Sequence, residues 1–399
     1  MKQVWNEIKM VDACEILTCG LASTPKYVDE KIGVPFLSAQ NVRDGAVVLD
    51  KFSFISKELH KKLTSKNKPS KGDILYSRVG AKYGEAGVVE HNFEFSVYVS
   101  VTHIRAKKNL LNNYFLKNYL NSPKIKDLAR KSISSSGVPN LNVNSVREFP
   151  VPLPPLQEQQ RIVAILDEAF TAIDKAKANT EQNLKNVKEL FESELQRVFS
   201  EIGDDWEEKK LNEITEVKDG THDSPKYIPE GIPFVTQKNI KPDGMTFEGT
   251  KYITDLDHEK FYKRSNVSKN DILISMIGAN RGMAAIVDDE RVFSIKNVGL
   301  IKSSANINTH FLLYYLKSSL AMKYILYMSN GGAQEFIGLT ALRSFPIPYP
   351  PIKDQQTIVS KLDALREQTK KLEAVYEKKL QDLEELKKSV LSKAFSGEL

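Results

Sequence analysis

The chain repeats itself, and this repeat constrains the fold more than any other feature. The heptapeptide FPVPLPP at residues 149–155 returns 196 residues later as FPIPYPP at residues 345–351. The match continues without a gap, so that Gln159-Gln160 corresponds to Gln355-Gln356, and it ends at Phe199-Ser200 and Phe395-Ser396. A chain built from two like halves is expected to fold as two like units.

The segments before each heptapeptide also correspond, but only at scattered positions. These positions are Trp5 and Trp206, the Pro-Lys-Tyr strings at 25–27 and 225–227, the Gly-x-Pro-Phe strings at 33–36 and 231–234, and the Ser-Lys-x-Asp-Ile-Leu strings at 70–75 and 268–273. Between them the copies differ in sequence and in length. This pattern indicates one fold presented twice with two different surfaces.

Each heptapeptide leads into sequence that predicts a long helix. Proline excludes helix until the heptapeptide ends, and acidic and amide residues then fill the first turn, where a helix N-terminus favours them. Apolar or small residues follow at alternating steps of three and four, which is typical of a coiled-coil seam. The predicted seam comprises Ile162, Leu166, Ala169, Ile173, Ala176, Leu184, Val187, Phe191, Leu195 and Val198, and then Ile358, Leu362, Leu365, Thr369, Leu372, Tyr376, Leu380, Leu383, Leu386 and Val390.

Neither helix can bury its seam alone, so the two are predicted to pair. Roughly 43 residues at 1.5 Å each form a rod of roughly 64 Å. Antiparallel pairing of like helices creates a pseudo-twofold axis and places one module near each end, whereas parallel pairing requires the chain to return along the whole rod. The alternative is that each helix packs on its own module or mediates dimerisation.

The modules mix short strands, turns and helices. Strands are predicted at residues 73–77, 86–89, 97–101, 271–275, 284–287 and 298–301, and helices at 113–120 and 310–320. The predicted fold class is α+β: two related modules joined by two long helices that form an antiparallel coiled coil. The predicted domains are a module at 1–148, a Pro-rich entry and central helix at 149–203, a second module at 204–344, and a second Pro-rich entry and helix at 345–399.

Charge and composition narrow the class of protein. The net charge is +6, and because the two helical segments together carry −1, the remainder carries +7, where a polyanion could bind. No run approaches 18 apolar residues and the N-terminus lacks a signal-peptide pattern, so we expect a cytoplasmic protein without a membrane span. Cys14 and Cys19 are expected to be idle thiols, although a disulfide or zinc site is conceivable.

Predicted loops carry side chains that suit DNA. Gln and Asn can pair bidentately with adenine, Arg and Lys with guanine, and Ser, Thr, Lys and Arg with phosphate. The candidates in the first module are Lys26, Tyr27, Gln40, Asn41, Arg43, Arg78, Lys82, Tyr83, Ser135 and Asn140. Those in the second are Lys226, Tyr227, Gln237, Lys238, Asn239, Lys241, Asn280, Arg281 and Gln334. Exposed loops contain such residues in any protein, so each position is only a prediction.

A catalytic site is not evident in the sequence. We find no Gly-rich nucleotide or adenosylmethionine turn, no nucleophile-elbow motif and no paired metal spacing among the six histidines. Residues 219–223 (Asp-Gly-Thr-His-Asp) suit a turn better than a metal loop. We therefore expect a binding protein with no catalytic residue, metal site or cofactor of its own.

These features resemble the specificity (S) subunits of type I restriction–modification systems. The resemblance is carried by residues 149–167 and 345–363 with their Gln-Gln, Ile-Val and Leu-Asp pairs, by the C-terminal string LSKAFSGEL at 391–399, and by the Trp, Gly-x-Pro-Phe and Lys-x-Asp-Ile-Leu strings of the modules. It covers the full length of the chain.

The resemblance implies two target-recognition domains, each of which reads one half of a split, asymmetric site in double-stranded DNA. The helices would set the spacer between the half-sites. Two modification subunits would carry S-adenosylmethionine and methylate adenine, and restriction subunits would cleave DNA with ATP and Mg. The family offers no invariant recognition residues to transfer, so the candidates above rest on chemistry and position. The alternative function is a non-catalytic coiled-coil scaffold for protein–protein assembly.

Overall fold

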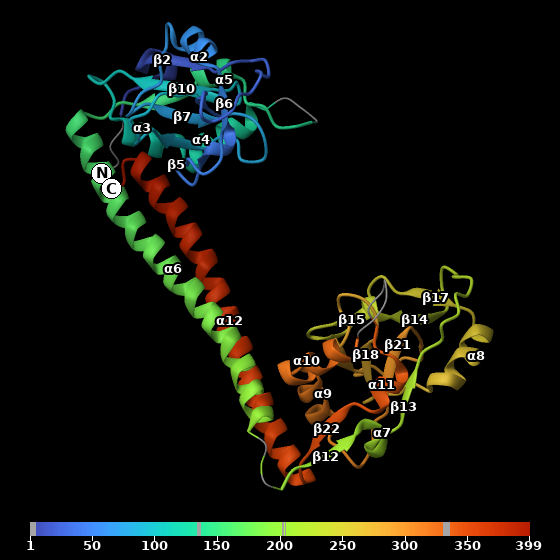
Figure 1. Cartoon of the computed structure of the whole chain (residues 1–399). Helices are drawn as coiled ribbons and strands as arrows, with labels where there is room; N and C mark the ends of the chain where they lie inside the picture. Colours follow the sequence, from blue (N-terminus) through green and yellow to red (C-terminus); the bar gives the residue numbers. More distant parts are fainter. Residues whose placement is uncertain (1–4, 134–136, 202, 204, 330–335) are drawn as a thin grey trace. The chain divides into compact units, whose positions relative to one another are not determined.

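The protein divides into two compact units that each combine one module with parts of both long helices (Figure 1). The computed structural model describes residues 5–133, 137–201, 203, 205–329 and 336–399. The first unit comprises residues 1–181 and 378–399, and the second comprises residues 182–377. Each unit therefore contains the beginning of one long helix and the end of the other.

The first module is built on two sheets. The larger has the strand order β2 (Cys14–Cys19), β10 (Val101–Ala106), β7 (Ile74–Ser77), β8 (Ala86–Val88), β5 (Ala46–Val47) and β4 (Val42–Arg43). The smaller has the order β6 (Ser53–Ile55), β3 (Val34–Leu37) and β9 (Ser96–Val97). The module's helices are α1 (Met10–Ala13), α2 (Lys57–Thr64), α3 (Asn113–Leu120), α4 (Pro123–Lys131) and α5 (Val143–Arg147), with a 3-10 turn η1 (Ala39–Asn41).

The second module repeats this plan. Its main sheet has the order β13 (Val217–Asp219), β21 (Val298–Ile301), β18 (Ile272–Ser275) and β19 (Ala284–Ile286), and its smaller sheet has the order β17 (Lys251–Ile253), β14 (Ile232–Thr236) and β20 (Ser294–Lys296). A hairpin of β15 (Ile240–Lys241) and β16 (Gly244–Met245) corresponds to β4 and β5. The helices are α7 (Leu211–Ile214), α8 (Asp255–Ser265), α9 (Thr309–Lys317), α10 (Ser319–Met328) and α11 (Leu339–Arg343), with the 3-10 turn η2 (Gln237–Asn239). In both small sheets the central strand pairs antiparallel with one neighbour and parallel with the other.

Most predicted elements are confirmed, and two are divided. The predicted strand at 97–101 is interrupted, because the chain turns between β9 and β10 and the Val101 amide donates to the Tyr98 carbonyl at 3.0 Å. The predicted helix at 310–320 is likewise two helices. Ser318 ends α9 and caps α10, as its hydroxyl accepts from the Ala321 amide at 3.3 Å. Ser and Thr caps satisfy the unpaired amides of a helix start, which explains the break.

Each Pro-rich heptapeptide contributes one strand to a small two-stranded ribbon. β11 (Pro150–Pro152) pairs with β1 (Glu7–Lys9), and β22 (Pro346–Tyr349) pairs with β12 (Glu207–Lys210). Proline cannot donate a ladder hydrogen bond, and an edge strand tolerates this loss. Each module is therefore closed by strands from its beginning and its end.

The predicted antiparallel packing of the long helices is confirmed within each unit. The helices are α6 (Leu156–Ser200) and α12 (Ile352–Phe395). In the first unit, Lys177 pairs with Glu384 at 2.5 Å and Asp174 with Lys387 at 3.2 Å, so positions descend along one helix as they rise along the other. In the second unit, Lys361 pairs with Glu194 at 2.7 Å. Exposed ion pairs contribute little, so the buried apolar seam supplies most of the stability.

The seam departs from its prediction at two positions of α12. Leu372 and Leu386 are 41% and 48% exposed. Glu373 and Lys387 occupy the half-buried positions instead. Lys387 lies over the Phe170 ring, with its Nζ 5.1 Å from the ring centroid, and its long aliphatic chain covers apolar surface there. The seam steps by four residues from Thr369 to Glu373, so the prediction was wrong at Leu372 and Leu386.

The last turn of each long helix packs into the module that precedes the other long helix. Phe199, near the end of α6, meets Phe311 and Tyr315 of α9 at ring-centroid distances of 5.5 and 5.3 Å. Phe395, near the end of α12, meets Phe115 and Tyr119 of α3 at 5.2 and 5.1 Å. The equivalence of these contacts explains why the sequence repeat extends to Phe199 and Phe395.

In each module, the aspartate of the Ser-Lys-x-Asp-Ile-Leu string holds a turn to the main sheet through hydrogen bonds. Asp73 accepts from the Ser70 amide at 2.9 Å and from Arg105 of β10 at 2.8 Å, and it contacts His103 at 2.7 Å. Asp271 accepts from the Ser268 amide at 2.8 Å and from Lys302 at 2.6 Å. Burial alone would raise the pKa of Asp73, but hydrogen bonds from His103 and Arg105 outweigh it and lower the pKa to about 2.

We expect Phe199→Ala to lower the free energy of unfolding of the second unit by about 3–5 kcal/mol, because it removes a fully buried ring from a packed cluster. The chain contains two tryptophans, one in each module. In a Trp5→Phe background, Trp206 fluorescence during urea unfolding reports the second unit. Leu190→Ala, which removes a half-exposed side chain from the same helix, should change the unfolding free energy by less than about 0.5 kcal/mol. Equal effects of the two substitutions would contradict the packing described here.

We expect Asp73→Asn to destabilise the first unit by about 2 kcal/mol at neutral pH, the value of a pKa lowered from 3.8 to about 2. Because folding lowers this pKa, the contribution is complete above about pH 4 and is lost as the pH falls toward 2. The measurement is urea unfolding from pH 7 to pH 2, followed by Trp5 fluorescence in a Trp206→Phe background. A difference between wild type and variant that stays constant over this range would refute the assignment.

Candidate nucleic-acid interface

Arg78 lies at the centre of a group of loops in the first module. Its backbone amide donates to the Ser100 carbonyl at 2.8 Å, and its carbonyl accepts from the Leu141 amide at 2.8 Å. Its guanidinium donates to Asn140 Oδ1 at 3.0 Å and to Cys19 Sγ at 2.9 Å. The side chain is buried. Arg78 therefore ties together the loops that follow β2, β7 and β9 and the segment that precedes α5.

One of these loop contacts recurs in the second module with a different residue. Met276 takes the place of Arg78, and its carbonyl accepts from the Ile337 amide at 2.8 Å. An isolated bridge joins Ile277 to Phe336, as another joins Val79 to Asn140 in the first module. This pair of backbone contacts is thus shared by the two modules, while the side chain at the corresponding position changes from a cation to an apolar thioether. Such a frame can carry two different surfaces.

Asn41 and Asn239 hold their own loops in shape. Asn41 is fully buried; its Oδ1 accepts from the Ser38 amide at 3.0 Å, and its Nδ2 donates to the carbonyls of Val48 and Lys51 at 3.0 and 2.8 Å. Asn239 accepts from the Thr236 amide at 3.0 Å and donates to Thr250 Oγ1 at 2.9 Å. Both amides are buried and hydrogen-bonded to other groups of the protein, whereas the prediction placed them on base edges. Their neighbours Gln40 and Lys238 are exposed.

The remaining candidates differ in exposure. The exposed ones are Lys26, Tyr27, Gln40, Lys82, Asn140, Lys226, Tyr227, Lys238, Lys241 and Asn280, and the half-buried ones are Arg43, Tyr83, Gln237 and Arg281. Arg43 pairs with Asp50, whose pKa is lowered mainly by the hydrogen bond from Arg43. Gln237 Oε1 accepts from the Ser275 hydroxyl at 3.0 Å. Lys251 lies over the Tyr227 ring at 4.3 Å.

Two candidates, Ser135 and Gln334, lie outside the described residues. The structure also contains a turn at residues 98–100 that the sequence analysis did not predict. There Ser100 Oγ accepts from the Ala39 amide at 3.0 Å, and the Tyr98 amide donates to the Leu37 carbonyl at 2.8 Å. The apolar run from Val97 to Val101 concealed this turn, because it reads as one strand. Asn297 is the matching position in the second module, with its Oδ1 2.7 Å from His222 Nδ1.

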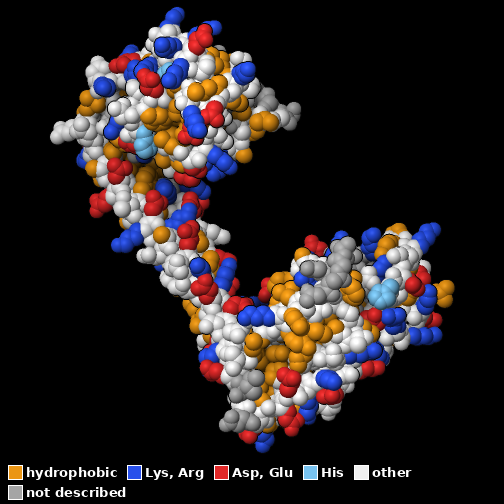
Figure 2. All heavy atoms as spheres, in the orientation of Figure 1, with side chains coloured by type: hydrophobic (Ala, Val, Ile, Leu, Met, Phe, Trp, Pro, Cys, Tyr) orange, Lys and Arg blue, Asp and Glu red, His pale blue; other side chains and the backbone are white. Residues whose placement is uncertain are grey.

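Charge is mixed over the visible surface. Figure 2 shows Lys and Arg side chains interspersed with Asp and Glu on this face of both modules and along the helices. Several of these cations are paired, including Lys126 with Glu85 at 2.5 Å and Lys260 with Asp223 at 3.0 Å.

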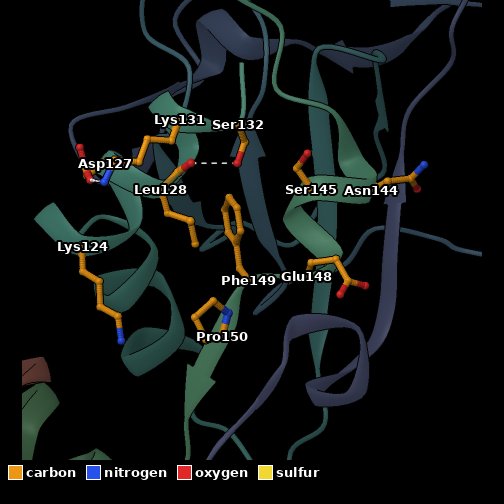
Figure 3. A pocket seen from close by; sticks show the side chains of 10 residues that line it. All are labelled: Lys124, Asp127, Leu128, Lys131, Ser132, Asn144, Ser145, Glu148, Phe149 and Pro150. Carbon is orange, nitrogen blue, oxygen red and sulfur yellow. Dashed lines mark hydrogen bonds and ion pairs between the residues drawn. The ribbon is translucent and has the colours of Figure 1, made fainter. Parts of the chain in front are cut away.

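An open hollow of about 680 Å³ lies between α4 and α5 (Figure 3). Leu128, Phe149 and Pro150 line its apolar part. Both acidic groups at its rim are held by cations: Asp127 by Arg130 and Lys131, and Glu148 by Lys9. Hydrogen bonds from Lys131 and Arg130 lower the pKa of Asp127, so this carboxyl is poorly suited to accept a proton at neutral pH.

The 219–223 segment and the two cysteines also carry groups that could take part in chemistry. Asp219 forms a two-point pair with Arg264 at 2.8 and 2.9 Å, which places the 219–223 segment in a salt-bridged turn. Cys14 and Cys19 are free thiols, and burial raises the pKa of Cys14 to about 12. Among the described residues, no three or more His, Cys, Asp or Glu side chains gather in a way that could hold a metal ion. Within the same part of the chain, no helix is long and apolar enough to cross a membrane.

The architecture is that of a two-module protein whose modules are joined by paired long helices and display loops on a shared frame. The family model described as "Type I restriction modification DNA specificity domain" matches the chain twice, over residues 2–186 and 203–384. The chain therefore belongs to the family of type I restriction–modification DNA specificity proteins.

Similar proteins agree with this membership along the whole chain. The putative type I restriction enzyme MjaX specificity subunit of Methanocaldococcus jannaschii is 25% identical over 423 residues, which cover 99% of this chain and 93% of that protein. The EcoKI specificity subunit of Escherichia coli strain K12 is 21% identical over 391 residues, which cover 92% of this chain and 82% of that protein.

Solved structures share the fold. A chain from a study of complex assembly and conformational transition of the type I R-M system aligns with a TM-score of 0.77 at 19% identity, covering 99% of this chain and 98% of that chain. The HsdS subunit from Thermoanaerobacter tengcongensis aligns with a TM-score of 0.63 at 18% identity, covering 99% and 97%.

We expect Asn41→Ala to lower the unfolding free energy of the first unit by about 1–3 kcal/mol, because it leaves buried backbone groups of the loop without partners. Gln40→Ala is the matched control. Gln40 is exposed and makes one long hydrogen bond, 3.4 Å to the Lys51 carbonyl, so its loss should cost less than about 0.5 kcal/mol. Urea unfolding in the Trp206→Phe background measures both, and a cost at Gln40 that matches the cost at Asn41 would contradict the assigned roles.

Proposed function

We propose that this chain is the DNA-reading specificity subunit of a type I restriction–modification complex. Each module reads one half of a bipartite, asymmetric site, and the paired helices set the number of base pairs between the halves. The observation that supports the proposal is a shared loop contact: the Arg78 carbonyl accepts from the Leu141 amide in one module and the Met276 carbonyl from the Ile337 amide in the other, while the side chain at this position differs. Two readers of one design with different side chains suit two unlike half-sites.

The side chains for direct reading are the exposed loop residues. Gln40, Asn140 and Asn280 carry amides that can pair with base edges, while Lys82, Lys238 and Lys241 can reach phosphates. Arg78 has a positioning role in this proposal, since its guanidinium holds Asn140 and Cys19. The buried Asn41 and Asn239 keep the loops in shape.

Catalysis belongs to partner subunits in this proposal. Two modification subunits supply S-adenosylmethionine and methylate adenine, and restriction subunits cleave DNA with ATP and Mg. The exposed apolar positions of the helices, including Leu190, Leu372 and Leu386, are available for docking a modification subunit. The complex acts on chromosomal and invading DNA in the cytoplasm. A scaffold for protein assembly alone would not explain why the corresponding loops carry different residues, Arg78 and Met276, in the two modules.

The test is co-expression of the chain with its modification partner, followed by sequencing of methylated adenines across the host genome. We expect one bipartite motif with a constant spacer. Exchange of residues 1–148 for the first module of another specificity protein should change one half of the motif and leave the other half and the spacer unchanged. A methylome without a bipartite motif, from a complex that assembles normally, would refute the proposal.

A further inference from the structure

The first glutamine of each Gln-Gln pair is buried at the junction between a module and a long helix. Gln159 and Gln355 are both 0% exposed, one turn into α6 and α12. The second glutamine of each pair, Gln160 or Gln356, is exposed. The repeat therefore contains two glutamines side by side in the sequence with opposite environments, one buried and one exposed.

Gln159 connects three parts of the chain through three hydrogen bonds. Its Oε1 accepts from the Asn112 amide at 2.8 Å, and its Nε2 donates to the Leu110 carbonyl at 2.8 Å and to the Pro154 carbonyl at 2.9 Å. From its place near the start of α6, the amide group thus satisfies backbone atoms of the module and of the Pro-rich entry at one point. Hydrogen bonds are directional, so this point restrains rotation of the module about the helix more than apolar contacts would.

Further hydrogen bonds connect this restraint to the loops that are proposed to read DNA. Asn112 caps α3, as its Oδ1 accepts from the Tyr114 and Phe115 amides at 2.9 and 3.1 Å. At the other end of α3, Asn121 donates to and accepts from the Ala86 backbone at 2.9 Å. Ala86 begins β8, directly after the 78–84 loop. One short helix therefore joins Gln159 to the loop centred on Arg78.

The second module has the same junction with one exchange. Gln355 Oε1 accepts from the Asn308 amide at 2.8 Å, and its Nε2 donates to the Pro350 carbonyl at 2.9 Å. The carbonyl that corresponds to that of Leu110 belongs to Asn306, and here the Tyr349 hydroxyl donates to it at 2.5 Å. Tyr349 replaces Leu153 of the first heptapeptide. The carbonyl is thus satisfied in both modules, by Gln159 in one and by Tyr349 in the other.

From this geometry we infer that Gln159 and Gln355 are positioning residues that hold each DNA-reading module at a defined angle to its long helix, and so make the complex selective for one spacer length. The inference rests on the proposed function. It separates two kinds of selectivity: loop side chains govern which bases are read, and the junction glutamines govern how strictly the two half-sites must be spaced. Because Tyr349 supports the second junction, loss of Gln355 has the smaller effect.

The test uses the complex assembled with its modification partner and duplexes that carry the motif found by methylome sequencing. One set varies the spacer by one base pair in each direction, and a second set varies single bases of the half-sites. Methylation rates give the two selectivities. Gln159→Met removes the amide while keeping an unbranched side chain of similar length, and Gln160→Met is the control at the exposed neighbour.

For Gln159→Met we expect the preference for the native spacer to fall about tenfold or more, while the preference for the correct bases changes less than about twofold. Gln160→Met should leave both unchanged. Gln355→Met should reduce spacer preference by a smaller factor, and Gln355→Met with Tyr349→Phe should reach the level of Gln159→Met. This series keeps the test open should the Gln159 variant fail to fold.

Two outcomes would overturn the inference. One is an unchanged spacer preference in variants that assemble normally. The other is an equal loss of spacer and base preference, which indicates a general loss of structure. Failure of the proposed function has a different signature, since the wild-type complex would then methylate no bipartite motif at all.

Discussion

The structure depends on the burial of two narrow apolar seams that no single helix can cover. Leu166 and Leu195 of α6 and Leu362 and Leu391 of α12 are buried, where the paired helices meet the cores of the modules. The same pairing brings Phe395 against α3 and Phe199 against α9. Each module's core is thus completed by the far end of the helix that follows the other module. The aromatic cluster of the first module requires the end of α12, and that of the second requires the end of α6.

Within each module, buried polar groups maintain the shape of the backbone. Asp73 and Asp271 hold a turn to the main sheet, Asn41 and Asn239 hold a loop, and Gln159 and Gln355 hold the module to a helix. Such groups must be hydrogen-bonded when buried, so each fixes the position of the backbone atoms that it contacts. These polar anchors recur at matching positions although most of the surrounding sequence differs.

The buried anchors and the exposed loop residues are thus different side chains, which suits a protein that reads varied targets. The anchors keep the loop frame, while the central residue and the exposed side chains change between modules, as from Arg78 to Met276 and from Lys82 to Asn280. A frame held by its own hydrogen bonds tolerates substitution at exposed positions, because those side chains contribute little to stability. Selectivity can then change without loss of the fold.

The repeat, the Pro-rich entries and the three-four spacing of apolar residues predicted both long helices and their pairing, and the short strand-like runs and helices of the modules predicted the α+β class, because these signals are local or periodic. The sequence could not show that Leu372 and Leu386 face away from the seam. Packing against the partner helix determines where the seam advances by four residues instead of three. It also could not separate buried Asn41 from exposed Gln40, or Gln159 from Gln160, because neighbours of one chemical type differ only in what the folded chain places around them. The turn at residues 98–100 was hidden for the same reason: an apolar run predicts a strand, and the turn is stabilised by contacts with Leu37, Ala39 and Arg78 from distant parts of the chain. Periodicity along the chain therefore specified the architecture, whereas long-range hydrogen bonds selected which polar residues hold the structure and which remain available to bind.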